Sequence, residues 1–372
     1  MSVKNIMVAI GTRPEAIKMA PVYKALKSRA LGNTVLCSTG QHREMLDQAL
    51  QLFDMTPDIS LDLMTPGQDL SALTARVMTG VRDTIRQVKP DALLVHGDTT
   101  TCLGATLAAF YEHVPVGHVE AGLRTYNLEA PWPEEMNRRL VDPICKWCFA
   151  PTDMARQNLL NEHVAGERIF VTGNTAIDSL QLMLESITKN PPTIPELEGK
   201  PLDGKDVVLV TGHRRESFGD GFDNLCLGLR DIADTLKNVA IIYPVHLNPR
   251  VQEPVQRILG QHPNIHLLPP LSYLPFVWLM QRSSIIITDS GGIQEEAPSL
   301  GKPVLVMRDT TERPEAIVAG TAKLVGTDRV RIAGEAIKLL TDRAAYQAMS
   351  SARSPFGDGH AAQRIVDILS CD

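Results

Sequence analysis

The stretch Ser284-Ile-Ile-Ile-Thr-Asp-Ser-Gly-Gly-Ile-Gln-Glu-Glu296 joins an apolar run to a polar turn with two adjacent glycines. The run Ser284–Thr288 predicts a buried strand, and the residues after the turn predict a helix that continues to Leu300. Adjacent glycines are poor helix formers, and they leave the first backbone N–H groups of the helix uncovered. Because the helix dipole favours negative charge at this end, the stretch predicts a place for a phosphate group.

Glu296 supports this interpretation, since it lies one turn beyond Gly292 on the same face of the predicted helix. A carboxylate at that place can accept hydrogen bonds from the hydroxyls of a ribose. Strand, glycines and acid together therefore predict a site for a nucleotide diphosphate. The alternative is a tight turn between a strand and a helix that binds no ligand, and these residues alone fit it equally well.

Short β-branched runs alternate with helix-length amphipathic segments along the whole chain. Runs that are apolar throughout predict strands covered on both faces, and hence parallel sheets flanked by helices. The predicted strands are Asn5–Ile10, Thr34–Ser38, Asp91–His96, Pro115–Glu120, Trp147–Ala150 and Arg168–Thr172 in the first half, and Asp206–Thr211, Val239–Tyr243, Asn264–Leu268, Ser284–Thr288, Pro303–Met307 and Ala322–Val325 in the second.

The proline-rich stretch Asn190–Gly199 separates the two halves and predicts a linker. We therefore predict an α/β protein with two Rossmann-like, doubly wound domains that face one another. Near the end of the chain, Gly359–Ser370 predicts one more amphipathic helix. A chain of 372 residues is long enough for about two domains of ordinary size.

Composition narrows the class of protein. No apolar run is long enough to cross a bilayer, and Met1–Ile10 predicts a first strand, not a secretory signal. The formal net charge of −6 disfavours nucleic acid as the main partner. The six cysteines are scattered, as in a reduced cytoplasmic protein. We expect a cytoplasmic protein that contacts neither nucleic acid nor membrane.

The pair Cys145-Lys-Trp-Cys148 has the spacing of some metal sites. A zinc site needs a second ligand pair, and none follows at a suitable distance. The pair lies where a predicted helix runs into a strand, so we expect buried structural thiols. The histidines show no ligand spacing, and the first strand leads to no dinucleotide-binding fingerprint. The sequence therefore predicts no metal site.

Polar residues gather at the carboxyl ends of the predicted strands, where open parallel sheets bind their ligands. These ends are Gly11-Thr-Arg13, Gly97-Asp98, Glu120–Arg124, Gly212–Glu216, His246 and Asp289–Gly292. Arginine binds phosphate bidentately and stabilises charge on a leaving group. Arg13 and His213 directly follow apolar strands, so we expect them to face a ligand. Lys18, farther along the first helix, fits a surface role equally well.

The acids at these ends form a second group. Asp98 and Glu120 terminate neighbouring predicted strands, so we expect them to converge in one pocket. Carboxylates held close together have their pKa values pushed apart and can divide acid and base roles. Glu134 and Glu135 follow Pro131-Trp-Pro133 at a predicted helix start, where acids are also common for structural reasons.

The chain resembles the bacterial non-hydrolysing UDP-N-acetylglucosamine 2-epimerases in segments that keep the family's order from Gly11 to about Gly359. These segments are Gly11–Lys18, Gln41–Glu44, His96–Thr100, Gly117–Arg124, Pro131–Glu135, Gly212–Glu216 and Asp289–Glu296. The resemblance implies the glycosyltransferase-B architecture, with two Rossmann-like domains facing a central cleft. It implies domains at residues 1–180 and 181–358, with a C-terminal helix at 359–372 packing back on the first domain.

The resemblance also implies a reaction that uses no cofactor. UDP is removed from UDP-N-acetylglucosamine by anti elimination, and its return to enzyme-bound 2-acetamidoglucal gives UDP-N-acetylmannosamine, a precursor of cell-surface polysaccharide. Carried over by motif, the catalytic set is Asp98, Glu120, Glu134 and His213. The set that binds UDP is Arg13, Lys18, Phe276, Ser290, Gly291, Gly292, Glu296 and Arg313. Which carboxylate is the base in each direction stays open.

A second, activating UDP-N-acetylglucosamine and a homodimer are further properties that the resemblance implies. The matching residues for the activator are Gln41, Gln68, Arg214 and His246. One position departs from the family: Leu271 stands where related enzymes often carry glutamine near the uracil. A backbone contact to the base could survive this change, whereas a side-chain contact could not.

Four other functions compete with this interpretation. A UDP-sugar glycosyltransferase on the same fold would need an acceptor site but not the acidic set. A hydrolysing epimerase would release free N-acetylmannosamine, and this chain has no additional kinase-sized domain. A non-catalytic nucleotide-sugar sensor need not keep Asp98, Glu120 and His213 together. A paralogue could act on a diacetamido uronic acid derivative.

Overall fold

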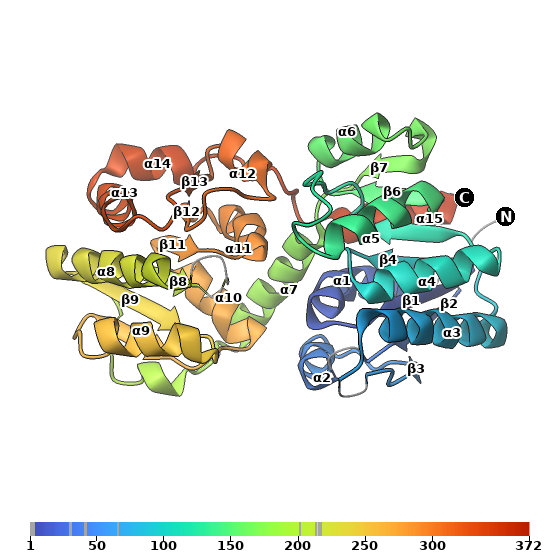
Figure 1. The fold of residues 1–372 in the computed structure, drawn as a ribbon, viewed down its shortest axis with the longest axis horizontal. Coiled ribbons are helices and arrows are strands. Elements are labelled where there is room, and N and C mark those ends of the chain that lie inside the picture. Colours follow the sequence, from blue (N-terminus) through green and yellow to red (C-terminus); the bar gives the residue numbers. More distant parts are fainter. Residues whose placement is uncertain are drawn as a thin grey trace. The chain divides into compact units, whose positions relative to one another are not determined.

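The computed structural model describes residues 4–29, 32–40, 43–64, 67–200, 202–212, 214 and 218–371. The chain divides into two compact units, one of Met1–Leu182 with Phe356–Asp372 and one of Met183–Pro355. Each unit is a parallel β-sheet flanked by helices (Figure 1). In the part of the chain that the structure describes, no helix is long and apolar enough to span a membrane.

The first unit is built on a seven-stranded sheet in the order β3-β2-β1-β4-β5-β6-β7. All its pairs are parallel, and β4 lies between β1 and β5. Its strands are β1 Asn5–Ile10, β2 Asn33–Ser38, β3 Ile59–Ser60, β4 Ala92–His96, β5 Val116–Val119, β6 Trp147–Ala150 and β7 Ile169–Val171.

The helices of this unit cover both faces of the sheet. They are α1 Arg13–Arg29, α2 Arg43–Leu52, α3 Leu70–Val88, α4 Thr100–Tyr111, α5 Glu134–Val141, α6 Asp153–Asn161, the start of α7 Thr175–Lys189, α15 Ala361–Cys371 and the short 3-10 helices Asp142–Ile144 and Gly166–Arg168. Helices α3 and α4 pack together over a core that includes Val77, Val81 and Ala105. Cys145 and Cys148 are buried in the same core, which confirms the prediction of buried thiols.

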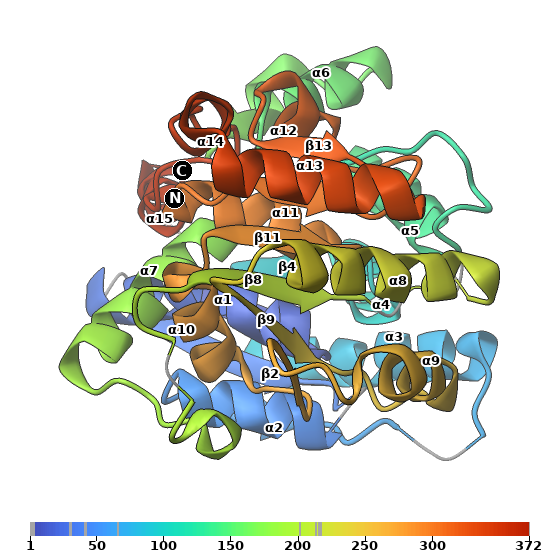
Figure 2. The same cartoon turned by 90° about the vertical axis from the view of Figure 1, so that its left-hand side faces the viewer.

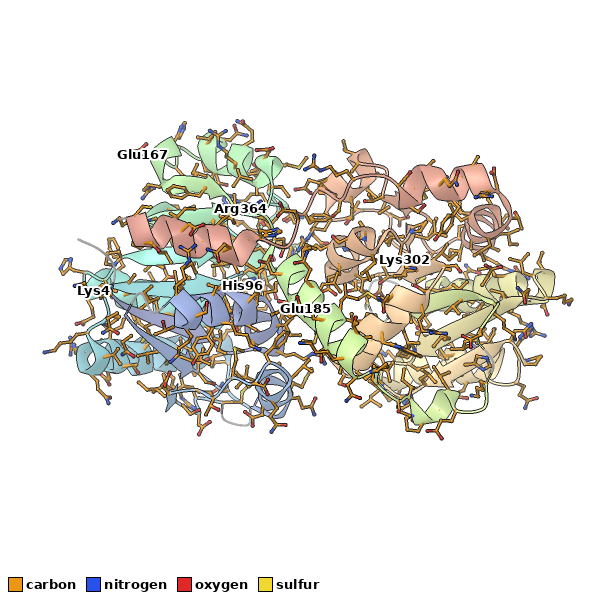
Figure 3. The ribbon with its side chains drawn as sticks, turned by 180° about the vertical axis from the view of Figure 1, so that it is seen from behind. Lys4, His96, Glu167, Glu185, Lys302 and Arg364 are labelled. Atoms are coloured by element: carbon orange, nitrogen blue, oxygen red, sulfur yellow. The ribbon has the colours of Figure 1, made fainter. Side chains whose placement is uncertain are left out.

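The last helix, α15, belongs to the first unit and packs against α1. Asp178 of α7 caps its N-terminus by accepting hydrogen bonds from the backbone N–H groups of Ala361 and Ala362, at 3.2 and 2.8 Å. Arg364, labelled in Figure 3, donates to the carbonyl of Thr172 after β7 at 3.0 Å. Cap and side chain together fasten the end of the chain to the first sheet.

The second unit is built on a six-stranded parallel sheet in the order β10-β9-β8-β11-β12-β13. Its strands are β8 Asp206–Thr211, β9 Val239–Pro244, β10 Ile265–Leu268, β11 Ile285–Thr288, β12 Val304–Val306 and β13 Ala322–Leu324. Figure 2 shows α8 Asp220–Thr235 between α9 Pro249–Leu259 and α13 Arg329–Thr341, and it packs against both. The remaining helices are α10 Tyr273–Arg282, α11 Gly291–Glu296, α12 Pro314–Val318, α14 Arg343–Ser350 and the 3-10 helices Pro195–Leu197 and Ala297–Leu300.

Each predicted strand is present, and no end differs from the prediction by more than one residue. The short edge strand β3 was not predicted, because two residues are too few to show a period. The helix predicted to continue to Leu300 is α11 followed by a 3-10 turn over Ala297–Leu300. The prediction of doubly wound α/β domains is confirmed.

Candidate active site

The sheet of the first unit brings three of the predicted segments to one edge. Because β4 lies between β1 and β5, the residues that follow these strands are neighbours. Arg13 begins α1 after β1, Asp98 follows β4, and Glu120 follows β5. A pocket of about 410 Å³ opens there, and its lining includes Arg13, Asp98, Glu134, Thr99 and Asn137. Arg13, Asp98 and Glu134 therefore share one pocket, whereas Glu120 is not among the residues that line it.

Glu120 has an unusual backbone for its residue type. Its φ is +71°, in the left-handed region that non-glycine residues rarely adopt. Such conformations persist where the surrounding structure enforces them, and they gather at functional sites. The Glu120 carboxylate forms an ion pair with Lys18 of α1, and both side chains are largely buried. Lys18, which the family resemblance assigned to UDP, thus lies against a carboxylate of the catalytic set.

His96 is a site residue that the sequence analysis did not single out. It is the last residue of β4 and is labelled in Figure 3. Its Nε2 lies 3.5 Å from Oε2 of Glu120, and its side chain is 5% exposed. Within the described residues this nitrogen has no hydrogen-bond partner. His96 therefore forms part of the buried surroundings of the Glu120 carboxylate.

Asp98 is held by α5 through both its backbone and its side chain. Asn137 donates to the Asp98 carbonyl at 2.7 Å, and Arg138 Nη1 donates to Asp98 Oδ2 at 2.9 Å. Arg138 also donates to the buried carboxylate of Glu135 at 2.8 and 3.1 Å. Burial alone would raise the pKa of Glu135, but the backbone N–H groups of the 125–126 turn and the Arg138 charge lower it overall. Glu135 is thus a structural acid, next to Glu134 in the pocket wall.

A second buried acid, Glu15, supports the turn after β1. Its carboxylate accepts hydrogen bonds from the N–H groups of Gly11 and Thr12, at 2.9 and 2.7 Å. The hydroxyls of Thr12 and Thr99 donate to it at 2.8 and 2.6 Å. Burial raises the pKa of Glu15 against the opposing effect of these donors. Since Thr99 is the N-cap of α4, Glu15 ties the turn before Arg13 to the turn after Asp98.

In the second unit, α11 begins directly after β11 with Ser290 as its N-cap. A Cβ added at Gly291 or Gly292 would meet no described atom within 4 Å. Packing among the described residues therefore does not require these glycines, whereas a ligand at the helix N-terminus would. Glu296 is 8% exposed at the far end of α11. The backbone N–H of Arg214 donates to Asp289 Oδ2 at 2.8 Å.

The cations near α11 are paired with acids. Arg313 forms an ion pair with the buried carboxylate of Glu295. Arg308 donates to Glu312 at 2.7 and 3.3 Å, and Arg214 Nη1 lies 3.6 Å from the same carboxylate. Burial alone would raise the pKa of Glu312, but Arg308 and Arg214 lower it to about 2. A phosphate that binds Arg313 must compete with Glu295.

The other predicted residues lie in several places. Phe276 is half-buried on α10, and Leu271 lies in the loop before that helix. Gln68 belongs to the first unit and accepts a hydrogen bond from Arg76 at 3.1 Å. His246 belongs to the second unit, is exposed, and accepts one from the backbone N–H of Asn248 at 3.1 Å. His213 and Gln41 lie outside the described residues.

Known proteins similar to this chain match it over nearly its whole length. The family model for UDP-N-acetylglucosamine 2-epimerase matches residues 24–370. The UDP-N-acetylglucosamine 2-epimerase of Escherichia coli K12 is 55% identical over 368 residues, which cover 98% of each chain.

Solved structures agree. The UDP-GlcNAc 2-epimerase of Neisseria meningitidis, solved with UDP-GlcNAc bound, is 47% identical with a TM-score of 0.91, covering 99% of this chain and 100% of that one. A glycosyltransferase of kitacinnamycin, 12% identical with a TM-score of 0.65 and 98% of each chain covered, shows the fold alone, which is of the glycosyltransferase-B type. The family predicted from the sequence is confirmed: the chain belongs to the UDP-N-acetylglucosamine 2-epimerase family of isomerases.

Proposed function

We propose that this protein interconverts UDP-N-acetylglucosamine and UDP-N-acetylmannosamine without a cofactor. Membership of the family supports the reaction, and the similar enzyme of N. meningitidis was solved with UDP-GlcNAc bound. The observation that carries the proposal is the edge of the first sheet, where Asp98 and Glu134 line one pocket and Glu120 is buried against Lys18. A nucleotide-sugar sensor would have no need of a carboxylate held in a strained backbone conformation.

The reaction follows from the acidity of the sugar carbon. The hydrogen on C2 is not next to a carbonyl carbon, so its direct removal is very difficult. In the proposal the C1–O bond breaks first, UDP leaves with the bonding electrons, and a carboxylate takes the C2 proton to give 2-acetamidoglucal. UDP then adds back to C1 while a group on the other face returns a proton to C2. Asp98, Glu120, Glu134 and His213 are the groups that we assign to these proton transfers.

We assign UDP binding mainly to the second unit. The residues are Arg13, Lys18, Phe276, Ser290, Gly291, Gly292, Glu296 and Arg313. The open space in front of Gly291 and Gly292 supports a phosphate at the N-terminus of α11. In each unit a proposed UDP-binding cation is paired with an acid, Lys18 with Glu120 and Arg313 with Glu295, so a phosphate that binds either cation must draw it partly away from its acid. Charge that develops on the leaving UDP would then be stabilised as it forms.

The test is incubation of the protein with UDP-GlcNAc in deuterated water. Elimination exchanges the C2 proton with solvent, so UDP-ManNAc and recovered UDP-GlcNAc should both carry deuterium at C2 by NMR. Product without deuterium would contradict elimination. Release of free N-acetylmannosamine would favour a hydrolysing epimerase, and transfer of the sugar to an acceptor would favour a glycosyltransferase.

UDP-GlcNAc also acts as an activator in this proposal, through Gln41, Gln68, Arg214 and His246. Gln41, Gln68 and His246 are neutral hydrogen-bonding groups, and Arg214 is a cation. Together these residues can hold a sugar nucleotide without taking part in bond breaking. Given UDP-ManNAc alone, the enzyme should be nearly silent, and traces of UDP-GlcNAc should start it. His246→Ala should weaken this activation more than it weakens UDP binding. Full-rate epimerisation of UDP-ManNAc from time zero, with no response to added UDP-GlcNAc, would contradict an activating site.

The proposal also includes a homodimer in the cytoplasm that supplies N-acetylmannosamine-type precursors for cell-surface polysaccharide. Light scattering after size exclusion tests the dimer, because a monomeric mass at micromolar concentration would contradict it. Fractionation of the source cells tests the location. Loss of N-acetylmannosamine from the cell surface after deletion tests the use of the product.

A further inference from the structure

A buried ion cluster lies beneath the two turns that carry Asp98 and Glu120. Its centre is His118 on β5, which is fully buried. The Nδ1 atom of His118 lies 2.5 Å from Oδ1 of Asp142, and its Nε2 lies 2.7 Å from the carbonyl oxygen of Gly97. The Gly97 carbonyl can only accept, so Nε2 carries a hydrogen. Burial alone would raise the pKa of Asp142, but the His118 and Arg124 charges lower it overall, so Asp142 is ionised. The Nδ1 atom that faces this carboxylate therefore also carries a hydrogen, and the ring is an imidazolium.

The charge on His118 is balanced within the cluster. Asp142 also accepts hydrogen bonds from Arg124 Nη2 at 2.7 Å and from the backbone N–H of Gly122 at 3.2 Å. Arg124 in turn donates to both carboxylate oxygens of Glu162, at 2.9 and 2.7 Å. His118 and Arg124 thus face Asp142 and Glu162, and Arg139 lies 3.6 Å from Glu162 as well. Burial alone would lower the pKa of the His118 imidazole, but the Cys102 sulfur and the Asp142 carboxylate raise it well above its ordinary range.

The cluster reaches one glycine in each turn. Gly97 precedes Asp98 and has φ +68°, and Gly122 follows Glu120 by two residues with φ +88°. A Cβ at Gly122 would lie 2.3 Å from the carbonyl oxygen of Ala155, so the backbone approach there is close. His118 holds the first glycine through its carbonyl, and Asp142 holds the second through its N–H. One ion pair therefore fixes the backbone of both turns.

We propose that the His118–Asp142 pair is a positioning device that sets the distance between the Asp98 and Glu120 carboxylates for proton transfer at C2. The inference rests on the proposed function. Elimination and re-addition need both carboxylates at fixed places around one sugar ring, and a misplacement of about 1 Å can cost on the order of 100-fold in rate. A role in stability alone does not need the charges, because a buried ion pair can be replaced by apolar residues at little cost in stability.

Two substitutions separate the two contacts of the ring. In His118→Asn the amide nitrogen takes the place of Nδ1, which keeps the donor to Asp142 and removes the donor to Gly97. In His118→Gln the amide nitrogen takes the place of Nε2, which keeps the donor to Gly97. We expect His118→Asn to lower kcat roughly 100-fold, because the Gly97 carbonyl loses its donor. We expect His118→Gln to lower it less than about tenfold, because Gly97 keeps a donor while Asp142 stays paired with Arg124 and still holds Gly122. UDP binding should stay within about threefold of wild type in both, because most of the proposed UDP-binding residues belong to the other unit.

Val81→Ala is the matched control for loss of stability. Val81 is fully buried on α3, and it neither lines the pocket nor belongs to the ion cluster. It should lower the melting temperature while kcat stays within about twofold of wild type, since it changes neither turn. Equal kcat in His118→Asn and Val81→Ala would overturn the positioning role. So would equal losses in His118→Asn and His118→Gln.

A measurement on the wild-type protein covers the case in which His118→Asn does not fold. Nitrogen NMR of histidine-labelled protein at pH 7 should show both ring N–H protons of His118. A neutral ring at pH 7 would overturn the proposal without any variant. Failure of the proposed function is recognised separately, because wild-type protein would then put no deuterium at C2 of UDP-GlcNAc.

Discussion

His118 in the first unit and Tyr243 in the second each donate a hydrogen bond to a glycine carbonyl after a neighbouring strand. The donor is a charged imidazolium in one case and a neutral phenol in the other. Each is fully buried on a strand next to the one whose end it supports. His118 donates to the carbonyl of Gly97 at 2.7 Å, and Tyr243 donates through its hydroxyl to the carbonyl of Gly212 at 3.1 Å. In both cases the glycine immediately precedes a residue of the proposed catalytic set, Asp98 in one unit and His213 in the other.

The difference is in what each anchor requires around it. The imidazolium of His118 must be balanced, and the balancing carboxylate of Asp142 reaches the turn that follows Glu120. A charged anchor thus couples two turns. The phenol of Tyr243 is neutral, since burial raises its pKa well above the ordinary range, and it supports one turn. We infer that paired charges fix the turns after β4 and β5 in the first unit, whereas a neutral hydrogen bond from Tyr243 holds the Gly212 carbonyl in the second.

The largest expected effect is the loss of stability when the charge of Arg138 in the first unit is removed. Arg138→Met removes the guanidinium that joins Asp98 to the buried carboxylate of Glu135. Breaking a buried pair leaves an uncompensated charge, so we expect the free energy of unfolding to fall by about 3–5 kcal/mol. Urea unfolding followed by circular dichroism measures it. The matched control is Arg86→Met, which breaks an exposed pair with Glu112 and should change stability little.

An equal free energy of unfolding in the two arginine variants would contradict the comparison. It would mean that the paired charges near Asp98 stabilise the protein no more than a surface pair does. A double variant sharpens the result. Adding Glu135→Gln to Arg138→Met removes the stranded carboxylate and should recover part of the lost stability.

The next effect is on catalysis. Asp98→Asn and Glu120→Gln keep the shape of each side chain but remove its ability to transfer a proton. We expect kcat to fall by roughly 100-fold or more, the usual scale of general acid–base effects. UDP binding, measured by calorimetry, should stay within about tenfold of wild type. Near-normal turnover in both variants would remove these residues from proton transfer and leave the ion cluster with nothing to position.

The strands and the place of the site could be predicted from the sequence, because both depend on local patterns. Apolar runs predicted the strands, and Asp98 and Glu120 are polar residues that directly follow two of those runs. The edge strand Ile59–Ser60 was missed because it is shorter than any period. Glu134 was predicted at a helix start, and α5 begins there.

The partners of these residues could not be predicted in the same way. Arg138 is 40 residues from Asp98 in the sequence, and Lys18 is 102 residues from Glu120. No spacing rule spans such separations, since only the order of the strands brings the residues together. His96 ends an apolar strand and His118 lies within one, and an isolated histidine at either place gives no sign of its partners. The partner of Arg313 is Glu295, and it was not predicted either, because the sequence pattern gave no reason to prefer it to the neighbouring Glu296.

A smaller effect concerns Glu312 of the second unit, whose contribution to the free energy of unfolding depends on pH. Arg308 and Arg214 lower the pKa of Glu312 to about 2 against the effect of burial. A group with a lowered pKa in the folded state stabilises the protein above its unfolded pKa, and this contribution is lost as pH falls from about 4.5 toward 2. Allowing for partial exposure, we expect it to be about 1–2 kcal/mol. Urea unfolding of wild type and Glu312→Gln at pH 6 and pH 3 should show a difference that shrinks at the lower pH. A pH-independent difference would show that Glu312 is not stabilised by its arginines.

The smallest effect tests the neutral anchor. Tyr243→Phe removes one hydroxyl and leaves the Gly212 carbonyl without that donor, so we expect a loss of about 1 kcal/mol in the free energy of unfolding. The Gly212 carbonyl accepts from a neutral phenol, whereas the Gly97 carbonyl accepts from an imidazolium, so the Gly212 carbonyl can relax at lower cost. We therefore expect kcat within about fivefold of wild type, a far smaller change than on His118→Asn. A loss of 100-fold in Tyr243→Phe would mean that one neutral hydrogen bond positions its turn as firmly as the ion cluster does, and the distinction between the two anchors would fail.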